Sequence, residues 1–420
     1  MKKLALIITL LFPMYLVKAQ SSEDIRKMIN DKKFTEARTA IDKFMGDSKN
    51  AQSAEGWYLK GRIYNSISND EATPVAERYQ LKTDAYEALK KSQELDPKET
   101  MMKLEQYISY LDLYFGFYDL GAKEFNDKEY VKSFEAFKKA LEVEDFIRTK
   151  GYTYTQMKIP AVDTSLIVNT AIAASQAKYT SEAVNYYRKI ADANIAGKDY
   201  KDVYEFLVDY YNRNNDAANL YPLLSKARTF YPENNFWNEV ELDRLQKAGD
   251  DKALFAKYDE LVAKEPNNFN LVYNYSVELY NRVWGKTNDK PADEAEKEKL
   301  ATVLKQAIAI DPGIDASMLM TNHLYNEASD LTNAAAIIKS TKAADVKQKA
   351  DLKAAGIKKM DETITYATRV ESYYEPKVDE LKPGQKANYK IVLGYLADIY
   401  SLKGDAKKSA EYEKKRSAVK

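Results

Sequence analysis

Residues 204–266 of this chain read YEFLVDYYNRNNDAANLYPLLSKARTFYPENNFWNEVELDRLQKAGDDKALFAKYDELVAKEP, and this stretch decides the fold. Tyr231-Pro232 and Glu265-Pro266 each close a segment, and the two closures lie 34 residues apart, which is a period of helix-turn-helix repeats. The first segment places apolar, aromatic or proline side chains at Tyr204, Val208, Tyr211, Leu220, Leu224, Ala227 and Pro232. One period later the same frame holds Asn238, Leu242, Leu245, Leu254, Tyr258, Leu261 and Pro266. The stretch therefore predicts two consecutive helix pairs.

The composition of the whole chain favours helices. Of 420 residues, 45% are hydrophobic and 30% are charged, whereas glycine and proline number only 14 and 11. The 64 basic and 64 acidic residues cancel. Because nucleic-acid binding normally needs a basic excess, we expect no nucleic-acid partner. The sequence has no cysteine, which excludes disulfides, metal–thiolate sites and a lipid-modified N-terminal cysteine.

The first 19 residues have the pattern of a secretory signal peptide. Two lysines precede an apolar run that starts at Leu4, and Ala19 marks the expected cleavage site. A membrane anchor is the alternative, but the run is shorter than the about 20 residues that a span needs and contains Pro13. We therefore expect residues 1–19 to be removed. The mature chain, 20–420, is then exported without a membrane span and is periplasmic or secreted.

Residues 57–97 carry a recognisable pattern. The first helix of this pair is marked by Trp57, Gly61 and Tyr64, in the spacing W-x-x-x-G-x-x-Y, and the second by Ala85, Leu89, Ser92 and Asp96-Pro97. This pattern resembles the tetratricopeptide repeat (TPR) family, and the signal sequence indicates an exported bacterial member. Gly61 and Ala85 are expected to let the two helices approach closely.

The resemblance implies the fold. It predicts an all-α chain, a right-handed superhelical solenoid of about eight to nine antiparallel helix pairs over 20–420, with a subdivision into 20–145, 146–312 and 313–420. In the third repeat we expect one long first helix, from about Glu99 to Phe125.

Four stretches depart from the regular repeat, at 68–80, 146–163, 285–298 and 329–359. The first and third are expected to be insertions between paired helices. The second is expected to be a loop with a short extended piece, and the fourth to be an extra helix or an elongated hairpin. If specificity lies outside the concave face of the solenoid, these stretches are where we expect it.

Catalytic chemistry has little support in the sequence. His323 is the only histidine, so a catalytic triad or a histidine-based metal site would depend on it alone. It falls inside a predicted first helix, where we interpret it as a surface or groove residue. Glycine-rich phosphate-binding loops are missing, and the carboxylates alternate with lysines as on solvated helix faces. We expect a protein that is not an enzyme and binds no cofactor or metal.

Tyrosine is the one compositional excess, at 33 residues. These rings suit either a stacking surface for sugars or peptides, or the packing positions of the repeat. The packing positions include Tyr64, Tyr211, Tyr258, Tyr280, Tyr325 and Tyr400. We therefore favour packing.

The resemblance also nominates a binding surface, because in the family the first helix of each pair lines the concave face. The residues that this rule places there are Tyr58, Arg62, Asn65, Tyr118, Phe125, Glu205, Asp209, Asn212, Arg213, Asn274, Glu278, Asn281, Arg282, His323 and Asn326. Their amides and mixed charges suit hydrogen bonds with the main chain of an extended peptide. We expect a scaffold or adaptor that binds another envelope or secreted protein in this groove. A glycan-binding exported protein that uses tyrosine-rich surfaces is the alternative.

Overall fold

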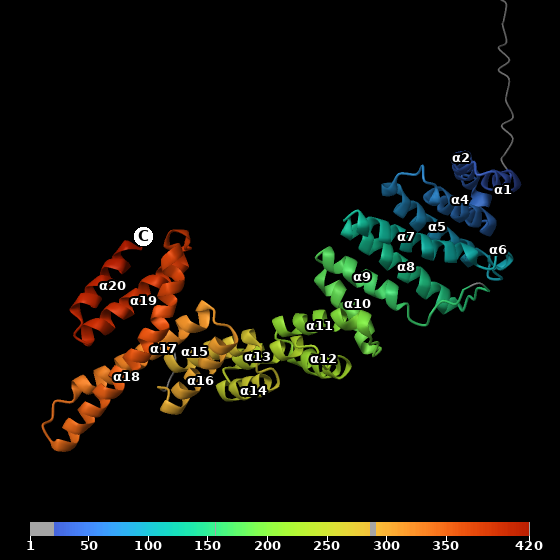
Figure 1. Cartoon of the computed structure of the whole chain (residues 1–420). Helices are drawn as coiled ribbons and strands as arrows, with labels where there is room; N and C mark the ends of the chain where they lie inside the picture. Colours follow the sequence, from blue (N-terminus) through green and yellow to red (C-terminus); the bar gives the residue numbers. More distant parts are fainter. Residues whose placement is uncertain (1–20, 156, 286–290, 420) are drawn as a thin grey trace, which may run out of the picture. The chain divides into compact units, whose positions relative to one another are not determined.

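The computed structural model describes residues 21–155, 157–285 and 291–419, which form α-helices joined by short connections (Figure 1). No strand occurs within these three ranges. Consecutive helices pack in tandem, so the expected all-α solenoid of helix pairs is confirmed. The predicted signal peptide lies outside the described residues.

The chain divides into two compact units, Met1–Trp237 and Asn238–Lys420. The expected middle part, 146–312, spans this division, and the boundaries near 145 and 312 stay predictions. The helices of unit 1 are α1 (Ser22–Asn30), α2 (Phe34–Met45), α3 (Ser48–Ala51), α4 (Ala54–Asn69), α5 (Val75–Leu95), α6 (Thr100–Leu104), α7 (Ile108–Asn126), α8 (Tyr130–Lys150), α9 (Thr164–Gln176), α10 (Thr180–Asp192), η1 (Lys198–Tyr200), α11 (Lys201–Arg213) and α12 (Ala217–Phe230). Helix α13 (Phe236–Ala248) begins at the division.

Unit 2 continues with the same kind of element. Its further helices are α14 (Asp251–Lys264), α15 (Phe269–Trp284), α16 (Glu294–Ile310), α17 (Ile314–Ile337), α18 (Ala343–Tyr374), η2 (Glu375–Glu380), α19 (Pro383–Leu402) and α20 (Ala406–Ala418). In the described part of the chain the pairs are α1/α2, α4/α5, α7/α8, α9/α10, α11/α12, α13/α14, α15/α16, α17/α18 and α19/α20. The expected number of about eight to nine pairs is confirmed.

Prolines end the second helices as the sequence predicts. Asp96, Tyr231, Glu265 and Asp311 each follow the last helical residue and precede a proline, and their φ angles lie between −135° and −124°. A residue before proline is driven out of the helical region by the proline ring. A proline directly after the residue that follows the helix therefore ends the second helix of four pairs.

Two glycines allow close contact within pairs. A Cβ atom at Gly61 in α4 would lie 2.7 Å from Cγ of Leu89 in α5. At Gly121 in α7, it would lie 2.6 Å from the ring of Phe137 in α8. Because real Cβ atoms do not approach so closely, a larger residue at either position forces the helices apart. The predicted close approach at Gly61 is confirmed.

The long helix expected from Glu99 to Phe125 is wrong. The chain breaks between α6 and α7, where Gln106 and Tyr107 adopt left-handed conformations with φ of 53° and 59°. The ring of Tyr107 stacks on Tyr152 at 3.8 Å, and its hydroxyl donates to Glu99 at 3.1 Å. Both contacts stabilise the break, and the stacking on Tyr152 comes from a segment that is far away in the sequence.

The four stretches that depart from the regular repeat have different structures. Most of 68–80 is helical, because α4 and α5 are long and only a short turn separates them. Helix α8 continues to Lys150, and the described residues of the following loop contain no strand, so the expected extended piece is wrong there. The insertion at 285–298 lies partly outside the described residues. Residues 329–359 belong to the joined ends of α17 and α18, which confirms the elongated hairpin.

Candidate functional site

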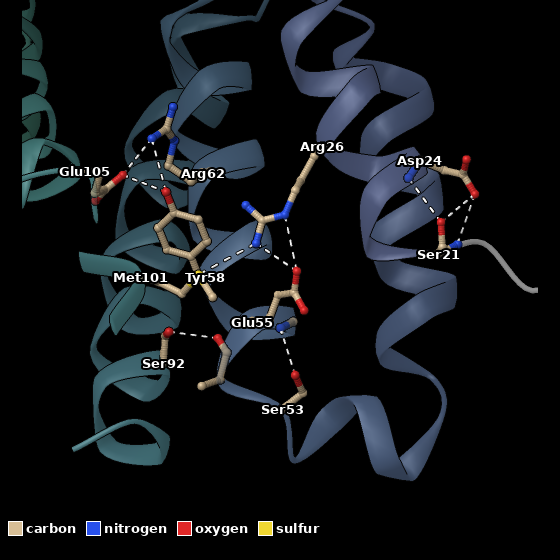
Figure 2. Close-up of polar contacts among 12 residues, drawn as sticks. Ser21, Asp24, Arg26, Ser53, Glu55, Tyr58, Arg62, Ser92, Met101 and Glu105 are labelled. Atoms are coloured by element: carbon tan, nitrogen blue, oxygen red, sulfur yellow. Dashed lines mark hydrogen bonds and ion pairs between the residues drawn. The ribbon is translucent and has the colours of Figure 1, made fainter. Parts of the chain in front are cut away.

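Polar side chains lie on α1, α4, α7 and α9 of unit 1 and at Glu105, between α6 and α7, and we group them under the name first-helix face. They are Arg26, Tyr58, Arg62, Asn65, Glu105, Asp112, Asp119, Asn126 and Asn169. Figure 2 shows its N-terminal part, where Arg26 of α1 pairs with Glu55 of α4 at 2.7 Å. The Arg26 guanidinium also donates to the sulfur of Met101 at 3.7 Å. Arg26 thus connects α1 with α4 and α6.

Glu105 organises the next part of the face (Figure 2). Its Oε2 atom accepts hydrogen bonds from the Tyr58 hydroxyl at 2.8 Å and from the Arg62 guanidinium at 2.6 Å. Its other oxygen accepts from the backbone N–H of Ser109 at 3.3 Å. The carboxylate therefore lies at the N-terminus of α7, where unpaired N–H groups favour a negative charge. Burial and then the Glu105 charge raise the pKa of Tyr58 to about 12.

A buried lysine lies next to this cluster. Lys82 of α5 is only 2% exposed, and its ammonium donates to Oδ1 of Asn69 at 2.5 Å. It fits against α7 because Gly116 has no side chain there. Burial lowers the pKa of Lys82 to about 8, although the charges of Asp119 and Asp112 oppose this shift. At neutral pH the face therefore retains a desolvated positive charge.

Exposed carboxylates continue along α7. Asp112, Asp119 and Asn126 are spaced by seven residues, which is close to two helical turns, so they lie along one face of the helix. Both aspartates are exposed. Partial desolvation raises the pKa of Asp112, while the nearby Arg62 opposes the shift. These carboxylates are available to a basic group of a partner.

An apolar notch lies at the end of this row. It has a volume of about 170 Å³ and is lined by Ala122, Phe125, Asn126, Phe137, Asn169 and Ile172 of α7, α8 and α9. An apolar cavity of roughly 150 Å³ is large enough for benzene. The amide of Asn169 donates to the Tyr118 hydroxyl at 3.3 Å at its edge. The notch is therefore of a size to take one large apolar side chain.

The structure places the nominated residues of unit 1 in three situations. Tyr58 and Asn65 are each only 7% exposed, so they offer little surface to a partner. Arg62 is partly exposed, and Tyr118 and Phe125 lie half-buried at the notch. The residues nominated on α11 lie farther along the chain. Glu205 accepts from Lys201 at 2.8 Å and from Asn234 at 2.7 Å, whereas Arg213 pairs with Asp209 at 2.9 Å and Asn212 is half-buried.

The nominated residues of unit 2 form a second polar surface. Asn274 and Asn281 of α15 are exposed. Glu278 accepts from Gln246 at 2.9 Å, and Arg282 pairs with Glu296 at 3.1 Å. Asn326 of α17 donates to the Tyr280 hydroxyl at 3.4 Å. Unit 2 also holds a buried carboxylate, Glu327, which lines a cavity of about 530 Å³, but none of the nominated side chains lines this cavity. On the first-helix face of unit 1 the nominated Phe125 itself lines the notch, so this face is the more distinctive candidate.

His323 is not a surface or groove residue, and that interpretation is wrong. Its side chain is 0% exposed, and Nδ1 accepts a hydrogen bond from the indole of Trp284 at 3.1 Å. Burial, followed by the charge of Lys359, lowers the pKa of His323 to about 3. The imidazole is therefore neutral, with its proton on Nε2 at 3.3 Å from Glu327. It belongs to the core of unit 2.

Sequence reasoning did not find Arg26, Lys82, Glu105 or Asp112. Glu105 was placed inside a continuous helix, which hid its position at a helix start. For Lys82 a signal exists, because it is spaced three and seven residues before Ala85 and Leu89 on the buried stripe of α5. A lysine on such a stripe predicts a buried charge.

Three of the six tyrosines expected at packing positions are buried. Twelve tyrosines of the described chain are buried, and they include Tyr64, Tyr211 and Tyr258. By contrast, Tyr280, Tyr325 and Tyr400 are half-buried. The rings of Tyr325 and Tyr395 stack at 3.7 Å. Helix packing therefore uses much of the tyrosine excess.

Within the described ranges, no group of three or more His, Asp or Glu side chains is arranged to hold a metal ion. None of the helices described combines the length and the apolar character that crossing a bilayer requires.

The chain is similar to several solved structures. No family model and no curated protein sequence matches the chain. Among solved structures, the chain is similar to a chain of the Naa15/Naa10 complex bound to HypK-THB, with 13% identity, 95% of this chain covered and a TM-score of 0.32. It spans 57% of the length of that chain. It is also similar to the human IFIT1 dimer with m7Gppp-AAAA, with 13% identity, 93% and 79% of the two chains covered and a TM-score of 0.25.

Yeast Tom70 is a third similar structure, with 12% identity, 95% and 91% of the two chains covered and a TM-score of 0.25. All three TM-scores are low. The TPR-like architecture is therefore assigned from the helix pairs themselves, their close-packed glycines and their proline ends.

Proposed function

We propose that this protein is a non-enzymatic scaffold that binds an extended segment of another envelope or secreted protein along the first-helix face of unit 1. One observation carries this proposal: exposed carboxylates and an apolar notch follow one another along α7. Such a row of separate polar and apolar contacts is what an extended peptide needs. The ion pair between Arg62 and Glu105 orders these side chains before a partner binds, so less conformational entropy is lost on binding.

The spacing along α7 defines the partner segment. Asp112 and Asn126 are 14 residues apart, so they lie about 21 Å apart along the helix axis. An extended chain covers this distance with about six residues. We therefore infer a segment that combines a basic residue for Asp112 or Asp119 with a large apolar residue for the notch, within about six positions of each other.

Selection of random peptides displayed on phage against the full chain tests the proposal. The expected result is enrichment of peptides with an aromatic or branched aliphatic residue near lysine or arginine. Ala122→Trp fills the notch, so the apolar side chain of the peptide can no longer be buried there. The lost burial is worth about 1.5–3 kcal/mol, and the Kd of an enriched peptide is expected to rise at least tenfold. Asp112→Lys reverses one charge of the row and is expected to act in the same direction.

Glu87→Lys is the matched control for charge reversal, because Glu87 lies on the second helix α5 and 54% of its side chain is exposed. It is expected to bind like the unaltered protein. Failure to enrich any common motif, or equal binding by all three variants, contradicts the proposal.

Glycan binding was the alternative, and the exposed tyrosine rings bear on it. Tyr179, Tyr221 and Tyr373 are 40%, 45% and 45% exposed, and they lie on different helix pairs. A saccharide-stacking site needs neighbouring rings on one surface. A glycan array probed with the full chain tests this alternative directly.

Export is part of the proposal and rests on the first 19 residues, outside the described structure. Sequencing the N-terminus of protein from the periplasm or medium is expected to begin at Gln20. An N-terminus at Met1 in a cytoplasmic fraction contradicts it.

A further inference from the structure

The joined ends of α17 and α18 extend beyond the other helices of unit 2 (Figure 1). Helix α17 has 24 residues and α18 has 32, whereas α11 has 13. Eleven extra residues correspond to about 16 Å of additional helix. The two helices remain paired along this extension, where Gly356 packs against Thr332 and the ammonium of Lys349 donates to the backbone of Ile338 at 2.9 Å. The hairpin is therefore an ordered projection.

This projection is strongly basic. Residues 329–359 contain seven lysines and three aspartates, an excess of four positive charges in a chain that is neutral overall. Some charges are neutralised locally, since Lys347 pairs with Asp351 at 2.6 Å and Lys359 with Glu327 at 2.8 Å. Four exposed lysines have no carboxylate partner among the described residues. They are Lys339, Lys342, Lys353 and Lys358.

The projection also exposes large apolar side chains. Ile337, at the end of α17, is 77% exposed, and Val346, near the start of α18, is 51% exposed. The turn between them carries Lys339 and Lys342. Farther along α18, Ile357 is 49% exposed. The tip thus carries both apolar and cationic groups. Lys353, Ile357 and Lys358 lie farther along α18, where Lys358 lines a cavity together with Glu294 and Glu298.

We propose that the hairpin tip docks on the surface of an anionic lipid bilayer. The excess of lysines complements the negative charge of the lipid headgroups. Ile337 and Val346 insert at the boundary between headgroups and acyl chains, while the lysine stems extend so that their amines stay at the phosphates. A protein partner would need a continuous patch of matching shape, which isolated side chains on different turns do not form. A bilayer accepts each side chain separately, so it is the better fit.

This docking is peripheral and independent of peptide binding by unit 1. Removing one lysine from an anionic surface weakens attraction by about fivefold under favourable conditions, and moderate salt reduces the effect. We therefore expect changes in four lysines to weaken binding at least tenfold.

The test is cosedimentation of the full chain with vesicles of phosphatidylcholine, with or without one third phosphatidylglycerol. The chain is expected to sediment with the phosphatidylglycerol vesicles, and less so at high salt. A variant with Lys339→Gln, Lys342→Gln, Lys353→Gln and Lys358→Gln is expected to partition at least tenfold more weakly. Ile337→Ser tests the apolar contribution at unchanged charge and is expected to reduce partitioning severalfold.

The matched control removes the same charge from exposed lysines elsewhere. It carries Lys98→Gln, Lys158→Gln, Lys198→Gln and Lys407→Gln. All variants are first compared by circular dichroism, so that a loss of folding is recognised. The proposal is overturned if the unaltered chain ignores both kinds of vesicle, or if the control variant loses as much binding as the hairpin variant. If polyglutamate beads retain the chain through the hairpin while vesicles do not, the hairpin docks on acidic protein surfaces and the bilayer proposal is wrong.

Discussion

Replacing Lys82 by methionine is expected to stabilise the protein at neutral pH. Lys82 lies on the buried stripe of α5 and faces Gly116 of α7, and methionine has a similar length and shape without the charge. Lys82 is 2% exposed, and among the described residues its ammonium has one hydrogen-bond partner, the amide oxygen of Asn69. Because that amide belongs to an exposed residue, it regains water when the lysine is removed.

The magnitude follows from the pKa of Lys82. A pKa of about 8, compared with the usual 10.5, means that holding the charged form in the folded state costs about 3 kcal/mol. Losing the hydrogen bond to Asn69 costs at most about 1 kcal/mol. Lys82→Met should therefore raise the free energy of unfolding by about 2 kcal/mol at pH 7.

The pH dependence has a definite sign. Between pH 8 and 10.5 the unfolded chain retains the Lys82 proton, whereas the folded chain loses it, so the unaltered protein gains stability as the pH rises through this window. The advantage of Lys82→Met should consequently disappear by about pH 10.5. Other lysines and tyrosines titrate in this window too, but they are shared by both proteins and cancel in the difference.

Urea unfolding followed by circular dichroism at pH 7, 8.5 and 10 measures the difference. Lys91→Met is the control on the same helix, because 46% of the Lys91 side chain is exposed. Its effect is expected to stay within about 0.5 kcal/mol at each pH. If Lys82→Met destabilises the protein at pH 7, or if the difference between the two proteins does not change with pH, the inferred desolvation of Lys82 is refuted.

Two further predictions concern packing and a buried base. Gly61→Ala places a methyl group 2.7 Å from Leu89, so overpacking of about 1–3 kcal/mol should outweigh a helix-propensity gain of about 1 kcal/mol. Gly384→Ala, with no atom within 4 Å of the added Cβ, should be neutral or stabilising in the same urea assay, and the reverse order would contradict the close-packing argument. The neutral state of His323 makes unit 2 lose stability as the pH falls from about 6.5 toward 3. Urea unfolding of His323→Gln should show a shallower decline across that window, and an unchanged decline would contradict the assignment.

The repeat architecture was predictable because it depends on local signals. A 34-residue frame, prolines after second helices and small residues such as Gly61 each act within one helix pair. Every pair has the same helix-turn-helix structure, so a wrong helix boundary in one predicted repeat does not change the prediction for the next repeat. The hairpin at 329–359 was predictable for the same reason, since its Ala- and Lys-rich sequence favours helix on both sides of a short turn.

The details of the candidate face were not predictable because they depend on distant contacts. The break before α7 is stabilised by Tyr152, which lies 45 residues after Tyr107 in the sequence. Without that contact the local sequence predicts one continuous helix, in which Glu105 would be an ordinary surface residue. The prediction that His323 is exposed was wrong for a related reason. Trp284 covers His323 from another helix, and no local spacing in the sequence indicates this contact.

Features that exceed the needs of the repeat are the best guide to function. Ordering a residue costs roughly 1–2 kcal/mol of backbone entropy, and the repeat core offsets this by burying apolar surface. The end of the α17/α18 hairpin leaves Ile337 exposed instead, and Lys82 keeps a charge in a buried position. Neither feature is needed to stack one helix pair on the next, because pairs such as α11/α12 do so without them. The exposed tip is explained if it acts on a surface outside the chain. Lys82 is too deeply buried for such a contact, and its charge acts on the face through the neighbouring carboxylates of Asp112 and Asp119.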